Sequence, residues 1–171
     1  VGMAAAEAHL RAVFGPDLVD HRTFVFAGDG CLMEGISSEA ASLAGHLGLG
    51  RLIVLYDDNH ISIEGPTSLA FTEDVAARFA AQGWQTLHAD GHDRAAVAAA
   101  VAEALADETR PSLIACRTHI AFGAPTKQDS ADSHGSPLGE EEIAGAKMAM
   151  GWPVERRFEV DTAVYAFFRE G

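Results

Sequence analysis

The sequence predicts an α/β fold built on a doubly wound parallel sheet. Four short runs, 23–27, 52–56, 84–88 and 112–116, have the length and composition of buried strands. Segments with helical spacing of apolar residues lie between them. Strands that alternate with helices of ten or more residues form parallel sheets covered on both faces. The 171 residues, 48% of them hydrophobic, are enough for one such domain.

Helices are expected at 2–14, at 36–47, after Thr72, at 94–106, at 140–150 and at 161–169. In the first two, apolar residues recur every three or four positions and are expected to form core-facing stripes. These residues are Met3, Ala6, Leu10, Val13 and Phe14 in the first helix, and Ile36, Ala40, Leu43, Ala44 and Leu47 in the second. The stripe of the 94–106 helix is Val97, Val101, Ala104 and Leu105. The expected capping residues are Ser37 or Ser38, Thr72 and Asp93. Between Ala121 and Gly139 a long polar loop is expected, of the kind that often carries function.

Composition excludes several classes of protein. The formal net charge of −13 disfavours a nucleic-acid partner, which requires a basic face. No apolar run approaches the roughly twenty residues that span a bilayer, so no membrane partner is expected. Cys31 and Cys116 lie beside or within predicted core strands and are expected to be buried free thiols, which fits a reducing, cytoplasmic location. The chain begins within a helical pattern without a capping residue, so we expect a missing N-terminal portion.

Two motifs at the ends of predicted strands indicate a metal-bridged diphosphate site. The first strand runs into Gly28-Asp29-Gly30 and the second into Asp57-Asp58-Asn59. Glycines let a backbone approach a phosphate closely, but a carboxylate in the same turn would repel it. A divalent cation between the two removes the conflict. Ligands of open parallel sheets bind at the carboxyl ends of the strands, where both motifs lie.

The coordination needs of Mg²⁺ or Ca²⁺ suggest the remaining ligands. These cations take about six oxygens. Asp29 and Asn59 would each supply one, the backbone carbonyl of Ile61 another, and the diphosphate and water the rest. The N–H of Gly30 would donate to the diphosphate, aided by the N-terminus of the following helix.

Other interpretations of these residues are weaker. A Rossmann dinucleotide site would need G-x-G-x-x-G, whereas Gly28-x-Gly30 is followed by Gly35, and Asp29 would face a bare pyrophosphate. Each motif taken singly is more often a simple turn or strand end. His88 and His92 are four residues apart, but Asp90-Gly91 breaks any helix between them, which argues against a zinc pair.

The motifs extend into a pattern that resembles the transketolase family. The resemblance is carried by Gly28-Asp29-Gly30-Cys31-Leu32-Met33-Glu34-Gly35-Ile36-Ser37-Ser38-Glu39-Ala40, by Leu55-Tyr56-Asp57-Asp58-Asn59, and by Ser133-His134-Gly135 with Pro137-Leu138-Gly139. Shorter matches follow the same order over essentially the whole chain. The fold implied is a thiamine-diphosphate-binding domain of the diphosphate (PP) type.

The resemblance implies a role for each matching residue. Asp29, Asn59 and the Ile61 carbonyl would bind Mg²⁺ or Ca²⁺. Gly28 and Gly30 would lie against thiamine diphosphate, His134 would contact its diphosphate and act in catalysis, and Ile63 would pack on its rings. Glu34 and Glu39 would lie near a homodimer interface. Lys127 would reach a phosphate or remain a solvated lysine, and His119, where the family has an apolar or small residue, has no role.

The resemblance also implies the activity and the organisation of the complete enzyme. Residues 1–160 would be a PP domain lacking its N-terminal part, and 161–171 the start of a linker to a pyrimidine-binding domain or companion chain. The activity implied is transfer of a two-carbon ketol unit from a ketose phosphate to an aldose phosphate, with this chain alone inactive. Alternatives are a dihydroxyacetone synthase-like enzyme or a non-catalytic binding module of the same fold.

Overall fold

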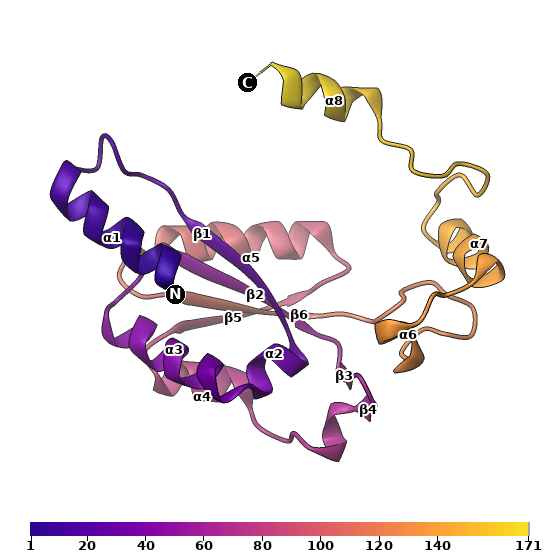
Figure 1. Ribbon diagram of the computed structural model, residues 1–171, viewed down its shortest axis with the longest axis horizontal. Helices are drawn as coiled ribbons and strands as arrows, with labels where there is room; N and C mark the ends of the chain where they lie inside the picture. Colours follow the sequence, from indigo (N-terminus) through magenta and orange to yellow (C-terminus); the bar gives the residue numbers. More distant parts are fainter. Residues whose placement is uncertain (171) are drawn as a thin grey trace.

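A computed structural model, described over residues 1–170, contains a four-stranded parallel sheet (Figure 1). The strands are β1 (Thr23–Gly28), β2 (Leu52–Asp58), β5 (Gln85–Asp90) and β6 (Ser112–Arg117). Their order is β1-β2-β6-β5, and every pairing is parallel. All four predicted strands are therefore confirmed, and their carboxyl ends share one edge of the sheet.

Helices cover both faces of this sheet, which confirms the doubly wound architecture. The longer helices are α1 (Gly2–Phe14), α3 (Gly35–His46), α4 (Val75–Ala81), α5 (Arg94–Ala106), α7 (Glu140–Ala149) and α8 (Thr162–Arg169). Figure 1 shows α5 on one face of the strands, with α3 and α4 on the other. Short elements complete the fold: α2 (Asp29–Met33), the antiparallel pair β3 (Ile61–Ser62) and β4 (Gly65–Pro66), a 3₁₀ turn (Thr67–Leu69) and α6 (Asp132–Gly135).

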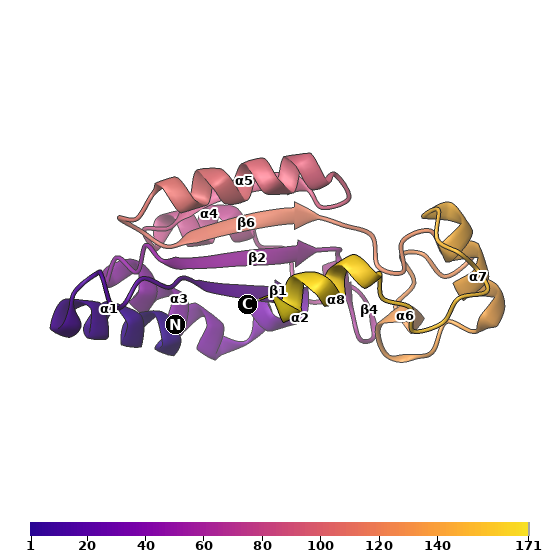
Figure 2. The same cartoon turned by 90° about the horizontal axis from the view of Figure 1, so that it is seen from above.

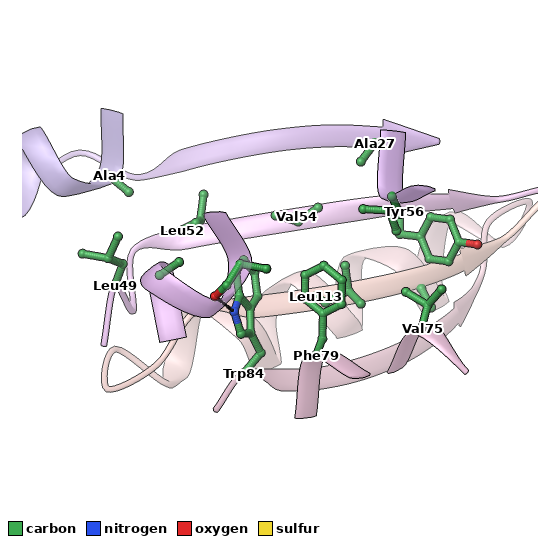
Figure 3. Packing of buried hydrophobic residues seen from close by; sticks show 14 residues of the cluster. Ala4, Ala27, Leu49, Leu52, Val54, Tyr56, Val75, Phe79, Trp84 and Leu113 are labelled. Carbon is green, nitrogen blue, oxygen red and sulfur yellow. Dashed lines mark hydrogen bonds between the residues drawn. The ribbon is translucent and has the colours of Figure 1, made fainter. Parts of the chain in front are cut away.

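Alternate residues of β2 enter two separate apolar clusters. Leu52, Val54 and Tyr56 pack with Phe79 and Trp84 on the side of α3 and α4 (Figure 3). The Trp84 and Phe79 rings meet edge to face at 5.0 Å, and the Trp84 indole N–H donates to the Ala41 carbonyl at 2.8 Å. On the other face, residues from β2, β6 and α5 pack together; they are Ile53, Ala100, Ala104, Ile114 and Cys116, with Val97, Val101 and Leu105 around them. The predicted stripe of the 94–106 helix is thus confirmed.

The larger apolar residues of α1 and α3 point outward, contrary to expectation. In α3 the buried residues are Ala41 and Ala44, whereas Ile36 and Leu43 are exposed. The reason is the short distance between elements: a Cβ on Gly45 would lie 1.8 Å from the Gln82 carbonyl oxygen, so only a face of small residues fits against α4. α1 likewise buries small Ala4, together with Glu7, and exposes the larger residues Met3, Leu10, Val13 and Phe14.

Two of the three predicted helix caps are wrong. Asp74, not Thr72, caps α4 by accepting a hydrogen bond from the Ala77 N–H. α3 has no side-chain cap: it begins at Gly35 with Glu34 at the N-cap position, so Ser37 and Ser38 lie within the helix, where the Ser37 hydroxyl donates to the Cys31 carbonyl. Asp93 caps α5 as expected, accepting from Ala95 and Ala96.

The segment that carries α6 and α7 lies beyond the carboxyl ends of the strands (Figure 2). The predicted loop 121–139 contains the short helix α6. Four residues are too few for apolar periodicity to reveal a helix. Residues 151–170 are exposed throughout, and a domain boundary near residue 160 stays a prediction. In the described residues no helix is long and apolar enough to cross a membrane.

Candidate cofactor-binding site

One cavity of about 520 Å³ at the carboxyl edge of the sheet collects most of the predicted site residues. Six of them line it: Gly28, Asp29, Gly30, Asn59, Ile61 and His134. β1 ends at Gly28 and α2 begins at Asp29, so the first motif is a strand-to-helix junction rather than an open turn. β2 ends one residue before Asn59, and its parallel register sets Asp57 beside Gly28. The sheet itself therefore brings the two motifs together.

Asp29 is a buried carboxylate held at both oxygens. Asp29 is only 3% exposed. The Tyr56 hydroxyl donates to Oδ1 at 2.5 Å, and the His60 backbone N–H donates to Oδ2 at 3.0 Å. Burial raises the pKa of the Asp29 carboxyl, and the Tyr56 hydrogen bond partly opposes that rise. A buried carboxylate without a countercharge of its own is a favourable position for a cation.

Asn59 and Ile61 line the same cavity. The Asn59 Oδ1 accepts from the Ile61 N–H at 2.9 Å, and its Nδ2 donates to Asp57 at 3.2 Å, which fixes the amide orientation. An amide oxygen has a second lone pair that remains for a ligand. Across the β3–β4 pair, Ile61 faces Pro66, which has no N–H to occupy the Ile61 carbonyl.

Gly30 leaves space that nothing in the described chain fills. A Cβ built on Gly28 or Gly30 meets no atom within 4 Å, and neither residue has a positive φ. Neither packing nor backbone conformation within residues 1–170 thus requires glycine here. A requirement for glycine at Gly30 would come from a ligand that approaches the backbone.

The long loop carries His134 to the cavity and is braced by Lys127. The ammonium of Lys127 donates to the Leu138 carbonyl at 2.9 Å, and the Ser133 hydroxyl donates to the Lys127 carbonyl at 2.8 Å. Glu142 of α7 accepts from the N–H of Lys127 at 3.3 Å. The Lys127 side chain is thus held against the loop rather than fully solvated, and its reach to a phosphate stays a prediction. It closes the segment that contains α6 and His134.

Sequence and structure comparisons agree on the origin of this arrangement. Residues 1–171 match the family described as transketolase, thiamine diphosphate binding domain. The chain belongs to the transketolase family. It is 55% identical to transketolase 2 of Xanthobacter flavus over 98% of its length and 52% identical to transketolase 1 of Escherichia coli over 97%. The Campylobacter jejuni transketolase structure superposes with a TM-score of 0.91 at 44% identity, covering 98% of this chain and 26% of that one.

The chain spans about a quarter of the length of these transketolases, 25% and 26% of the two curated sequences. The matching family description supports thiamine diphosphate as the ligand of the transketolase domain. The residues present also fit a hard divalent cation, because Asp29, Asn59 and Ile61 bring a buried carboxylate, an oriented amide and a backbone carbonyl to one cavity. Among the described residues, no group of three or more His, Cys, Asp or Glu is placed to hold a metal. A cation here would thus depend on mixed ligands.

The remaining predicted residues lie outside the cavity or differ from expectation. Ile63 is 69% exposed and does not line it. Glu34, between α2 and α3, and Glu39 are both exposed, so their interface role stays a prediction. Cys116 is buried and free as expected, but Cys31 is exposed and lines the cavity, because it belongs to α2 rather than to the strand.

Sequence reasoning missed three contributors to the site. Tyr56 orients Asp29. The only sequence signal for this role of Tyr56 was its position on the core-facing side of the strand, close to the strand's end. His92 and His119 line the cavity beside the motif residues. His92 follows β5 and His119 follows β6, so the two side chains meet only because these strands are neighbours in the sheet. No local sequence pattern reveals that pairing.

Proposed function

We propose that the complete protein is a thiamine-diphosphate-dependent transketolase that transfers a two-carbon ketol unit from a ketose phosphate to an aldose phosphate. One observation carries the proposal: Asp29, Asn59, Ile61 and Gly30, which are the ligands expected of the family, line one cavity together with His134.

In this proposal, Asp29, Asn59 and the Ile61 carbonyl hold Mg²⁺ or Ca²⁺, and the Gly30 N–H donates to the diphosphate. The cation offsets the repulsion between the Asp29 carboxylate and the phosphates. Thiamine diphosphate, when bound, supplies the carbon nucleophile of its thiazolium ring. Gly28 permits close approach, and Ile63 packs on the cofactor rings once the rest of the protein is in place.

His134 acts between cofactor and substrate. Its exposed imidazole, which lines the cavity, donates to the diphosphate and polarises substrate oxygens. The substrate class follows from the relatives: a Pichia stipitis transketolase, 45% identical with a TM-score of 0.90, was solved in complex with sedoheptulose 7-phosphate.

The complete enzyme is a homodimer with a pyrimidine-binding domain, in a cytoplasmic location. Support for an interface comes from the outward apolar residues of α3, where Ile36 is 69% and Leu43 50% exposed. Apolar side chains of this size gathered on one helix mark a surface that is covered in an assembly. Glu34 and Glu39 lie on or beside the same helix.

Calorimetric titration of the complete protein with thiamine diphosphate and Mg²⁺ tests the proposal. Wild type is expected to bind, and Asp29→Ala and Asn59→Ala to lose at least tenfold in affinity. Ketol transfer between sugar phosphates is then measured on the loaded wild type. Absence of binding in the wild type would refute the assignment. Binding without transfer to an aldose phosphate would favour the dihydroxyacetone synthase-like or non-catalytic alternatives.

A further inference from the structure

The cofactor cavity has an unusual balance of charge. Two carboxylates line it, Asp29 and Asp57. No lysine or arginine within residues 1–170 lines it; the basic side chains are the three imidazoles His92, His119 and His134. A diphosphate is strongly anionic, so donors beyond one divalent cation and a backbone N–H are needed here.

His92 cannot be the missing donor through its outer nitrogen. Its Nε2 accepts a hydrogen bond from the His119 backbone N–H at 2.9 Å. Its ring stacks on Phe122 at 3.9 Å between centroids and lies 5.7 Å from the His119 ring. His92 therefore packs behind His119 and supports the backbone at that position.

The His119 ring is held in one orientation. Its Nδ1 lies 2.9 and 3.0 Å from the two oxygens of Asp129. A carboxylate only accepts, so Nδ1 carries a hydrogen and Nε2 is left for another partner. The ring lines the same cavity as Gly30 and His134.

Asp129 is fixed in turn by the loop it closes. Its N–H donates to the Ile120 carbonyl at 3.0 Å, and its backbone has the left-handed φ of 59°, which is uncommon for a residue with a side chain. Inside the loop, the Gln128 side chain accepts from the Gly123 N–H at 2.9 Å. Backbone strain of this kind persists where the surrounding structure demands it.

We propose that His119 is a diphosphate-binding residue, with Asp129 as its positioning partner. The imidazolium donates from Nε2 to a phosphate oxygen while Nδ1–H stays on Asp129. This inference rests on the proposed function, because it needs thiamine diphosphate in the cavity. It assigns a role to a position where the family pattern gave none.

The test is calorimetric titration of the complete protein with thiamine diphosphate and Mg²⁺, followed by competition with magnesium pyrophosphate. His119→Phe keeps a planar ring beside His92 but removes both ring nitrogens, and about a tenfold loss of affinity is expected for both ligands. His119→Lys restores a cationic donor and should recover most of that loss. Asp129→Asn should fall between the wild type and His119→Phe. His88→Gln, an exposed histidine that does not line this cavity, is the matched control and should bind as wild type does.

The outcomes separate the inference from the function. If the wild type does not bind thiamine diphosphate, the proposed function fails. If the wild type binds and His119→Phe binds within twofold of it, the His119 assignment alone is overturned. Equal losses in His119→Phe and His119→Lys, with circular dichroism unchanged, would show that the position needs a particular shape rather than a donor, which also overturns the assignment.

Discussion

Tyr56 and Asp29, 27 positions apart, are joined by a 2.5 Å hydrogen bond from the Tyr56 hydroxyl to Oδ1 of the buried carboxylate. Tyr56 belongs to the apolar cluster on the α3 and α4 side of the sheet (Figure 3). The bond therefore connects the core directly to the proposed metal ligand. Burial raises the pKa of Asp29, and this bond is the largest influence that lowers it. The core thus helps to keep the carboxylate ionised.

Tyr56→Phe is expected to weaken Mg²⁺-dependent binding of thiamine diphosphate about fivefold at pH 7, the typical effect of one hydrogen bond. Without the hydroxyl, the pKa of Asp29 rises further. Because the cation needs the ionised form, the acid limb of the binding curve moves to higher pH. Titrations between pH 5 and pH 8 would measure both effects, and superimposable pH curves for the two proteins would contradict this role of Tyr56.

Asp29→Asn is expected to make the cofactor-free protein more stable at pH 7 while removing cofactor binding. The folded-state pKa of Asp29 is raised above 3.8, so ionisation costs stability as the pH rises from 3.8 through the folded value. Asparagine avoids that cost and keeps both hydrogen bonds, since its oxygen accepts from His60 and its amide donates to the Tyr56 oxygen. Thermal denaturation should show a higher midpoint for the variant at pH 7 and no advantage near pH 4. A lower midpoint at pH 7 would show that the ionised carboxylate stabilises the fold.

Gly30→Ala separates a ligand requirement from a folding requirement. Gly30 lies in α2 and its added Cβ meets nothing, so the fold should be unchanged or more stable by about 0.5–1 kcal/mol. The methyl group would enter the space proposed for the diphosphate, and a loss of affinity of at least tenfold is expected by calorimetry. Gly45→Ala is the converse control, because its Cβ would overlap the Gln82 carbonyl and destabilise the fold. Unchanged affinity in Gly30→Ala would place the diphosphate elsewhere.

How much the sequence predicted depends on whether a feature is local. The strands and the two strand-end motifs were predicted correctly, because short apolar runs and glycine signals are read from neighbouring residues. The outward faces of α1 and α3 were not, since larger apolar residues normally mark the core and here small residues permit the close approach of α3 and α4. The residue that caps α4 is Asp74 rather than Thr72. The two are only two positions apart, and apolar periodicity does not locate the start of a helix that closely.

The site was predicted in the same uneven way. Asp29, Asn59 and His134 came from motifs and were found around one cavity. Lys127 was left open between two roles, and its contacts with the loop gave no signal, because they depend on the path of a loop without periodicity. His119 and Asp129 gave no signal, since their pairing depends on how that loop closes on itself.

Lys127→Met is expected to loosen the segment that carries His134. The substitution removes the hydrogen bonds to the Pro137 and Leu138 carbonyls but retains the backbone contact with Glu142. The segment should become more sensitive to limited proteolysis, and affinity for thiamine diphosphate should fall severalfold. Lys147→Met, on α7 and outside the cavity, is the comparison variant. Identical digestion patterns for wild type and Lys127→Met would show that the loop is held by other contacts.

Arg51→Met is expected to be the most destabilising of these changes, although it lies at the opposite end of the strands from the cofactor cavity. Arg51 precedes β2 with its side chain only 11% exposed, pairs with Asp20 at 2.7 Å and Glu108 at 3.0 Å, and lies 3.8 Å from the buried carboxylate of Glu7. Removing the guanidinium leaves Glu7 buried without its cation, at a cost of roughly 3 kcal/mol or more. Arg110→Met, which breaks an exposed pair with Asp107, should lower the thermal midpoint far less. Equal shifts for the two variants would contradict a stabilising role for the Arg51 contacts.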